Sequence, residues 1–368
     1  MTQVRSVLVF LSAVDDQMPN LERFKFLRVF DLQGCNLSHG YNLDYLGSLF
    51  HLRYLSLRGT YIGELSDKVG DLQFLETLDV RDTLLFSLPS TIVQLKRLRR
   101  LHVHRWTKIS FWIGSLTSLE ELSFIHINDD SINTIEALHL LTKLRVLDMC
   151  LSMEWNEKMV DCLHKLRKIQ SLRIEFVDQR NTVDLDIWVA PPHLRRFQAR
   201  WCCWFSKLPA WMSSSHLPDL SILTIAVRGL QQKDLEILGR LPSLRRLDLE
   251  VDHDDLGIVG RFFIGPGFFP FLVRCGLFGF AIPVVFQHGA MPRLKAFEFE
   301  FSVREANEIV CSDSGFYMGL GNLQSLKRVK AAWLLYRDTS EQEVAEAKAA
   351  VIHAVEIHPN RPRLRIRR

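Results

Sequence analysis

The chain has 368 residues, of which 47% are hydrophobic and 24% are charged, and its formal net charge is +4. These values are typical of a folded globular protein, and the charge is too small over this length to indicate nucleic-acid or membrane binding by itself. No apolar run approaches the roughly 18 residues that a membrane-spanning helix needs. Composition therefore excludes disordered and membrane-spanning classes.

One spacing of apolar residues, LxxLxL, recurs along the whole chain. It is most regular at Leu52, Leu75 and Leu98, which follow one another at intervals of 23 residues. The fourteen frames begin at Val4, Leu27, Leu52, Leu75, Leu98, Leu119, Leu144, Ile169, Leu194, Leu220, Leu244, Leu272, Leu294 and Leu326. This period is the signature of leucine-rich repeats, in which the two inner apolar residues lie on a short parallel strand.

The frames predict an α/β solenoid, a leucine-rich repeat horseshoe with a parallel concave sheet and an irregular or helical convex side. One repeat cannot bury its own leucines, so the core forms only when repeats stack. We expect about fourteen repeats in residues 1–338, followed by a C-terminal capping helix and basic tail in 339–368. The frames at Leu272 and Leu326 are loosely spelled, and the register after about residue 250 is less well defined.

Other segments are expected on the convex side or at the ends. A helical segment is expected at 156–166, and the glycine- and phenylalanine-rich segment 256–292 is expected to be an apolar loop on the convex side rather than a ligand pocket. The pair Ser340 and Glu343 has the spacing of a capping box and starts a helix that ends near Ile357. The arginine-rich tail after it favours a solvated edge strand over a nuclear import patch.

No arrangement of residues in the sequence indicates catalysis, a metal or a cofactor. His102 and His104 are two residues apart on one strand face, but Asp79 and Ser123 are the nearest equivalents in the adjacent frames and supply no clear third ligand. The seven cysteines contain no CxxC pair, and a reduced Cys202 and Cys203 is favoured over a strained disulfide between them. We therefore predict a protein that is not an enzyme and that resides in a reducing compartment.

The concave sheet is the remaining candidate surface, and it is formed by the third, fifth and seventh positions of each frame. Early frames place cationic residues there, namely Arg58, Arg81, Arg100, His102 and His104. Later frames place acidic residues there, Asp248, Glu250, Glu298 and Glu300, with Trp201 nearer the middle of the chain. Opposite charges at the two ends suit protein partners better than a nucleic acid, which would require one sign throughout.

Three motifs make a family resemblance specific. They are the LxLRxT order at Leu55–Thr60 with LPxxI at Leu88–Ile92, the LPxW order at Leu208–Trp211, and the IHPN turn at Ile357–Asn360. In this order they resemble the leucine-rich repeat region of plant nucleotide-binding immune receptors, particularly the coiled-coil class of grasses. The chain has no GxxxxGK[ST] phosphate loop. The resemblance therefore covers one region of such a receptor, and a fragment, a truncated product and a free-standing repeat protein all remain open.

The resemblance implies a non-catalytic recognition role in plant innate immunity, either sensing a pathogen effector or restraining a nucleotide-binding domain. It implies a cytoplasmic location, with the nucleus as an alternative, and protein partners: a nucleotide-binding domain in cis or in trans, an effector, or a guarded host protein. Early repeats of the resembled family face the nucleotide-binding region. The early cationic residues are therefore expected to dock an acidic face of that domain, and the later set to face a ligand.

Two rival functions remain open at this point. The first is a leucine-rich repeat scaffold or adaptor with no immune role. The second is the substrate-recognition part of a ubiquitin ligase, which would need an F-box that the short stretch before the second frame cannot hold.

Overall fold

The computed structural model describes residues 4–8, 24–37, 43–128, 132–177, 181–200, 203–252, 262–280, 284–302, 318–334 and 340–366. The chain divides into two compact units, Met1–Gln179 and Arg180–Arg368, called unit 1 and unit 2 below. Trp201 and Cys202 lie outside the described residues.

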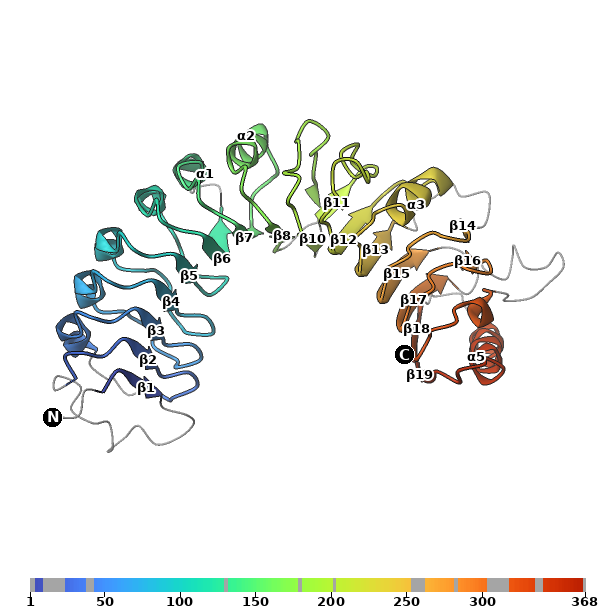
Figure 1. The fold of residues 1–368 in the computed structure, drawn as a ribbon, viewed down its shortest axis with the longest axis horizontal. Coiled ribbons are helices and arrows are strands. Elements are labelled where there is room, and N and C mark those ends of the chain that lie inside the picture. Colours follow the sequence, from blue (N-terminus) through green and yellow to red (C-terminus); the bar gives the residue numbers. More distant parts are fainter. Residues whose placement is uncertain are drawn as a thin grey trace. The chain divides into compact units, whose positions relative to one another are not determined.

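Unit 1 is a ladder of parallel strands that follow the chain in order (Figure 1). The strands are β1 Ser6–Leu8, β2 Val29–Asp31, β3 Tyr54–Ser56, β4 Thr77–Asp79, β5 Arg100–His102, β6 Glu121–Ile127, β7 Val146–Leu151 and β8 Ser171–Phe176. Each begins two residues after the first apolar residue of its frame. Leu55, Leu78 and Leu101 are register partners on adjacent strands, and all three are fully buried.

Short helices return the chain on the side of unit 1 opposite the strands (Figure 1). These are the 3-10 helices η2 Asp44–Ser48, η3 Asp67–Asp71, η4 Ser90–Gln94 and η5 Phe111–Ser115, then α1 Ile132–Leu138 and α2 Glu157–Lys165. The helix expected at 156–166 is confirmed as α2, with the Asn156 side chain accepting a hydrogen bond from the Met159 backbone N–H. That bond satisfies one of the N–H groups that a helix start leaves unpaired.

Unit 2 continues the same pattern with longer strands. Its main ladder contains β10 Arg196–Arg200, β12 Ile222–Val227, β13 Arg246–Val251, β15 Arg274–Phe280, β17 Ala296–Ser302, β18 Arg328–Leu334 and β19 Arg363–Ile366. All the described pairings in this ladder are parallel, and two shorter strands, β9 Asn181–Thr182 and β11 Cys203–Phe205, pair beside it. The weakly spelled frames at Leu272 and Leu326 are in register, because β15 and β18 also start two residues after their first anchors.

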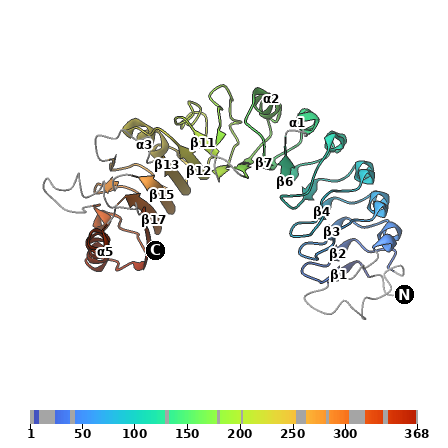
Figure 2. The same ribbon diagram turned by 180° about the vertical axis from the view of Figure 1, so that it is seen from behind.

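The helices of unit 2 lie on the side away from its strands (Figure 2). Among the described residues of unit 2 they are α3 Gln232–Gly239, η7 Leu320–Asn322 and α5 Glu341–Glu356. Helix α5 begins with the expected capping box, in which the Ser340 hydroxyl accepts from the Glu343 N–H and the Glu343 carboxylate accepts from the Ser340 N–H. Strand β19 then pairs with β18, so the arginine-rich tail forms the edge strand that its alternation predicts.

The phenylalanine-rich segment differs from the apolar loop expected at 256–292. Its described part contains β15 of the main ladder and a separate two-stranded parallel sheet, β14 Phe263–Ile264 with β16 Val285–Phe286. Phe269, Phe280 and Phe286 are almost completely buried. The phenylalanines therefore extend the core of unit 2, and backbone pairing accounts for a region that sequence alone left irregular.

The core of each unit is built from the frame residues, supported by hydrogen-bonded turns. In unit 1 the Thr60 and Thr83 hydroxyls donate to the Leu57 and Val80 carbonyls over 2.6 and 2.7 Å, which closes the turn after each strand. Each fully buried leucine contributes about 1.5–3 kcal/mol, so the anchors of adjacent repeats supply most of the stabilisation.

Within the described part of the chain, no helix combines the length and apolarity needed to cross a membrane.

Candidate functional site

The solvent side of the strands carries the third, fifth and seventh positions of each frame. Neighbouring parallel strands are about 4.8 Å apart, so equivalent positions form columns across a unit. In unit 1 the third-position column runs Tyr54, Thr77, Arg100 and Glu121, and the fifth-position column runs Ser56, Asp79, His102 and Ser123. All five early residues chosen from the sequence lie beside acidic side chains in or next to these columns.

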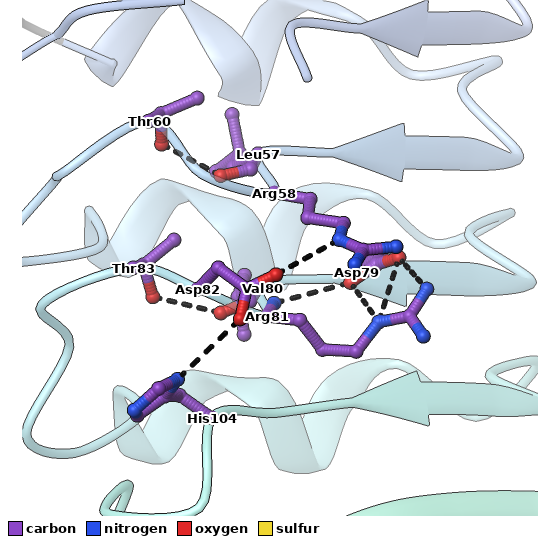
Figure 3. Close-up of polar contacts among 9 residues, drawn as sticks. All are labelled: Leu57, Arg58, Thr60, Asp79, Val80, Arg81, Asp82, Thr83 and His104. Carbon is purple, nitrogen blue, oxygen red and sulfur yellow. Dashed lines mark hydrogen bonds and ion pairs between the residues drawn. The ribbon is translucent and has the colours of Figure 1, made fainter. Parts of the chain in front are cut away.

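Asp79 is a buried carboxylate that holds Arg81 in place (Figure 3). The Arg81 Nε donates to Asp79 Oδ1 over 2.9 Å, and the Arg81 backbone N–H donates to the same oxygen over 3.1 Å. Burial alone would raise the pKa of Asp79, but the hydrogen bonds from Arg81 and the charges of Arg81 and His102 outweigh it, so the pKa lies below its usual range. The same hydrogen bond raises the pKa of Arg81.

Asp82 joins two more of the early residues (Figure 3). The Arg58 Nε lies 3.0 Å from Asp82 Oδ2, and the His104 Nδ1 lies 4.0 Å from Asp82 Oδ1. Asp82 itself has a positive φ of 56°, a left-handed backbone conformation that aspartate tolerates better than most residues. The turn after β4 therefore places this carboxylate between Arg58 of the preceding repeat and His104 of the next.

Glu121 lies beside the remaining two early residues, Arg100 and His102. Its Oε1 lies 3.3 Å from Arg100 Nε, and its Oε2 lies 3.9 Å from His102 Nε2. The His102 Nδ1 lies 3.1 Å from the Ser123 hydroxyl oxygen. Burial lowers the pKa of His102 below its usual range despite the nearby Asp79 carboxylate. Across the described residues, no group of three or more His, Cys, Asp or Glu side chains could hold a metal ion.

These contacts correct the expectation that the early strands form a cationic surface. Three arginines, Arg58, Arg81 and Arg100, face three carboxylates, Asp82, Asp79 and Glu121. We call these six residues with His102 and His104 the unit 1 charge network. Asp79 ends β4 and precedes Arg81 by two residues, so the alternation of side chains places both on the same face.

The columns of unit 2 surround a groove of about 290 Å³. The third-position column is Arg246, Arg274, Ala296, Arg328 and Arg363, and the fifth-position column is Asp248, Gly276, Glu298, Lys330 and Arg365. All of these except Gly276 line the groove, together with apolar residues of the strand between them. We call this feature the unit 2 groove.

Two carboxylates in the unit 2 groove already have partners. Asp248 Oδ2 accepts from Arg246, at 2.9 Å from Nε and 2.8 Å from Nη2, and Glu298 forms an ion pair with Lys330 on the next strand. Gly276 makes room for the first of these, because a Cβ there would lie 2.8 Å from Asp248 Oδ1 and 2.6 Å from the Phe278 ring. The acidic side chains are therefore held within the protein's own charge pairs.

These contacts also correct the expectation that the late strands form an anionic surface. The unit 2 groove is lined by six basic residues, Arg246, Arg274, Arg328, Lys330, Arg363 and Arg365, and by two acidic ones, Asp248 and Glu298. The rule that the third, fifth and seventh positions of a frame face solvent, called the position rule below, also selects basic residues in the late frames. These are Arg246, Arg274, Arg328 and Lys330. Glu250 is exposed on β13 and Glu300 is half-buried on β17, and neither lines the groove.

Comparison with known proteins finds a leucine-rich repeat family and similar proteins from plants. A family described as "Leucine-rich repeat region" matches residues 3–364. The disease resistance protein RGA5 of Oryza sativa subsp. japonica is 28% identical over an alignment of 380 positions, which covers 98% of this chain and 32% of that protein. The disease resistance protein Pik-2 of the same organism is 28% identical over 66% of this chain and 28% of its own length. The chain thus spans about a third or less of these curated relatives.

Solved structures show the same fold at low sequence identity. The Leptospira interrogans leucine-rich repeat protein LIC12759 superposes with a TM-score of 0.55 at 18% identity, covering 95% of this chain and 92% of that one. The ectodomain of the Arabidopsis receptor kinase HAESA, solved with a peptide hormone ligand, gives a TM-score of 0.53 at 16% identity, covering 85% and 56%. Both likenesses concern the fold alone.

Proposed function

Because the chain belongs to the leucine-rich repeat region family, we propose that it is a non-catalytic protein-recognition module of plant innate immunity, acting in the cytoplasm. The observation that carries this proposal is the similarity to a disease resistance protein over 98% of the chain. The strand faces support it, because they present columns of charged side chains at regular spacing. Such columns suit the many-point contacts of a protein interface.

We propose two roles for the two surfaces. The unit 1 charge network is the docking surface for a nucleotide-binding domain, in cis or in trans. Its arginines already have carboxylate partners, so the docked face must offer both signs of charge rather than an acidic surface alone. The strand face of unit 2 then meets the ligand, a pathogen effector or a guarded host protein.

The docking role can be tested by co-purification. The chain would be co-expressed with the nucleotide-binding region of a related disease resistance protein, with Arg81 and Arg100 unchanged or both replaced by Glu. Exposed and half-buried charges act mainly on association rate, so the reversed variant should bind more weakly, most clearly at low salt.

Lys68→Glu with Lys96→Glu is the matched control, because these exposed lysines lie on the helix side of unit 1 and reverse the same number of charges. Equal binding of the Arg81 and Arg100 variant and the parent at low salt would refute the docking role.

Isothermal calorimetry tests a further consequence, that the chain alone binds neither ATP nor ADP. Saturable nucleotide binding would contradict the proposed non-catalytic role.

A further inference from the structure

The unit 2 groove contains arginines that the described protein leaves without acidic partners. Arg274, Arg328, Arg363 and Arg365 are exposed, and none has an ion pair with any described carboxylate. After Asp248 and Glu298 are matched with Arg246 and Lys330, these four positive charges remain. Guanidinium groups are weakly hydrated and bind carboxylates through paired hydrogen bonds, so a row of them is suited to an anionic ligand.

The row has a length and a gap that restrict the ligand. Register places Arg246, Arg274, Ala296, Arg328 and Arg363 on five successive strands, so the row spans about 19 Å at about 4.8 Å per strand. Ala296 interrupts it with the smallest side chain of the column and leaves Arg274 and Arg328 about 10 Å apart. A compact anion such as a phosphate could reach only part of this row. An extended chain of about six residues covers all of it, at about 3.3 Å per residue.

The polar lining favours a peptide over a nucleic acid. Asp248 and Glu298 lie between the arginines, and their side chains are 19% and 34% exposed. A uniform phosphate backbone would meet these carboxylates as repulsive charges, since nucleic-acid sites gain affinity from one sign of charge throughout. A peptide can place acidic side chains against the arginines and its backbone N–H groups against Asp248 and Glu298.

We propose that the unit 2 groove binds an extended acidic segment of a partner protein that runs across strands β13 to β19. Carboxylates of the segment pair with Arg274 and Arg328 on either side of Ala296, and with Arg363 and Arg365 at the end of the row. This inference rests on the proposed function as a recognition module, and it specifies the chemistry of the ligand as acidic.

The test is a binding titration with a defined probe. A fluorescent peptide of about eight residues, with Glu alternating with Ser, would be titrated with the full chain, and the same peptide with Gln in place of Glu would be run beside it. The Glu peptide should bind at least about tenfold more tightly, and its affinity should fall as salt rises. The Arg274→Gln and Arg328→Gln double variant should bind it about tenfold or more weakly, since each loses a charge-assisted hydrogen bond.

Two further variants separate electrostatics from shape. Ala296→Leu fills the gap without changing charge and should weaken the Glu peptide about threefold or more; β12 already carries an isoleucine, Ile222, in this column, so the fold accepts it. Arg245→Gln with Lys327→Gln is the matched control, because both are exposed residues that precede strands β13 and β18 and lie outside the groove. This control should change affinity less than about twofold. Thermal unfolding would verify that every variant is folded.

Several outcomes would overturn the inference. They are equal binding of the Gln peptide, an equal loss in the Arg245 and Lys327 control, or no loss in the Arg274 and Arg328 variant. Tighter binding of inositol hexakisphosphate or of a single-stranded oligonucleotide through Arg274 and Arg328 would also overturn it. If the peptide fails while the nucleotide-binding region still co-purifies, the proposed function stands and the acidic ligand is wrong. If the peptide binds and co-purification fails, the acidic ligand stands and the docking role of unit 1 is wrong.

Discussion

The strand faces of the two units have the same column geometry but differ in how their charges are satisfied. In unit 1, Arg58, Arg81 and Arg100 each have a carboxylate within 3.3 Å. In unit 2, Arg274 and Arg328 have none among the described residues, although the groove also contains two acidic side chains. The number of charges in a column therefore does not predict a binding surface. What matters is which charges the protein itself has already paired.

The difference has a local cause in the residues between the arginines. Unit 1 places an acidic residue two positions before Arg81, one position after it, and on the strand beside Arg100. Unit 2 places Gly276 and Ala296 at the corresponding points of β15 and β17. The small residues open the groove and remove potential partners at the same time.

The largest expected effect comes from breaking the core that both faces depend on. Leu78 is fully buried between its register partners Leu55 and Leu101. Leu78→Asp removes a buried leucine and inserts an unpaired carboxylate, which costs about 5 kcal/mol or more. Hydrogen exchange should show loss of protection in β3, β4 and β5 together, since each repeat is stabilised by its neighbours.

Leu84→Asp is the matched control for that experiment, because Leu84 belongs to the same repeat and is 66% exposed. It should change the free energy of unfolding by less than about 0.5 kcal/mol. Retained protection in the Leu78→Asp protein would show that the strands do not share one core.

The second-largest effect distinguishes the Arg81–Asp79 ion pair of unit 1 from the Arg246–Asp248 ion pair of unit 2. Asp79→Asn leaves Arg81 without its charged acceptor at a site where the carboxylate is 6% exposed, so unfolding should become easier by about 1–3 kcal/mol. Asp248→Asn in unit 2 should cost less than about 1 kcal/mol, because its carboxylate is 19% exposed and its arginine 34% exposed. Urea titrations of both variants measure the difference. Equal costs would indicate that burial does not distinguish the two faces.

A smaller effect concerns pH and His102. Burial lowers the pKa of the folded imidazole below its unfolded value near 6.5, so the folded state binds fewer protons. The contribution of this residue to stability is therefore complete above about pH 6.5 and is lost as pH falls through the lower folded pKa, with a slope of at most about 1.4 kcal/mol per pH unit. His102→Gln should flatten the pH dependence of the unfolding free energy in that window.

His193→Gln in unit 2 is the control for the pH experiment, because the side chain of His193 is 76% exposed. It should flatten the pH profile less than His102→Gln does. A profile that flattens as much for His193→Gln as for His102→Gln would remove the special role of the unit 1 histidine.

The smallest effect is expected at the rim of unit 1. Arg53 and Arg99 occupy the second frame position and reach carboxylates of the next repeat, Glu76 at 3.1 Å and Glu120 at 2.8 Å. The Arg53 side chain is 52% exposed, so Arg53→Gln should change the unfolding free energy by less than about 0.5 kcal/mol. Thermal unfolding at low and high salt measures this. A loss as large as that of Asp79→Asn would mean that exposed rim pairs are more important than the buried pair.

Most of the fold could be predicted from the sequence because repeat spacing fixes it. The first apolar residue of each frame placed the start of its strand, and Asn156 and Ser340 marked where two helices begin. Strands β14 and β16 could not be predicted. Each has two residues, and their pairing joins segments about twenty residues apart without a periodic signal.

The candidate surfaces were only partly predictable for a different physical reason. The position rule selected side chains that do point to the strand face, such as Arg81 and Asp248. It did not show that Arg81 binds Asp79 or that Asp248 binds Arg246, because ion pairing depends on distances that spacing alone does not give. Arg274 and Arg328, which have no ion pair with a described carboxylate, also occupy the third frame position, but their significance depended on Ala296 and Gly276 leaving the groove open.

The most direct test of the difference between the two faces is one binding comparison at low salt. The labelled Glu-containing peptide would be titrated with a unit 1 double variant, Arg58→Gln with Arg100→Gln, and with the unit 2 double variant, Arg274→Gln with Arg328→Gln. Both remove two positive charges. We expect a loss of about tenfold or more for the unit 2 variant and less than about twofold for the unit 1 variant. An equal or larger loss for the unit 1 variant would contradict it.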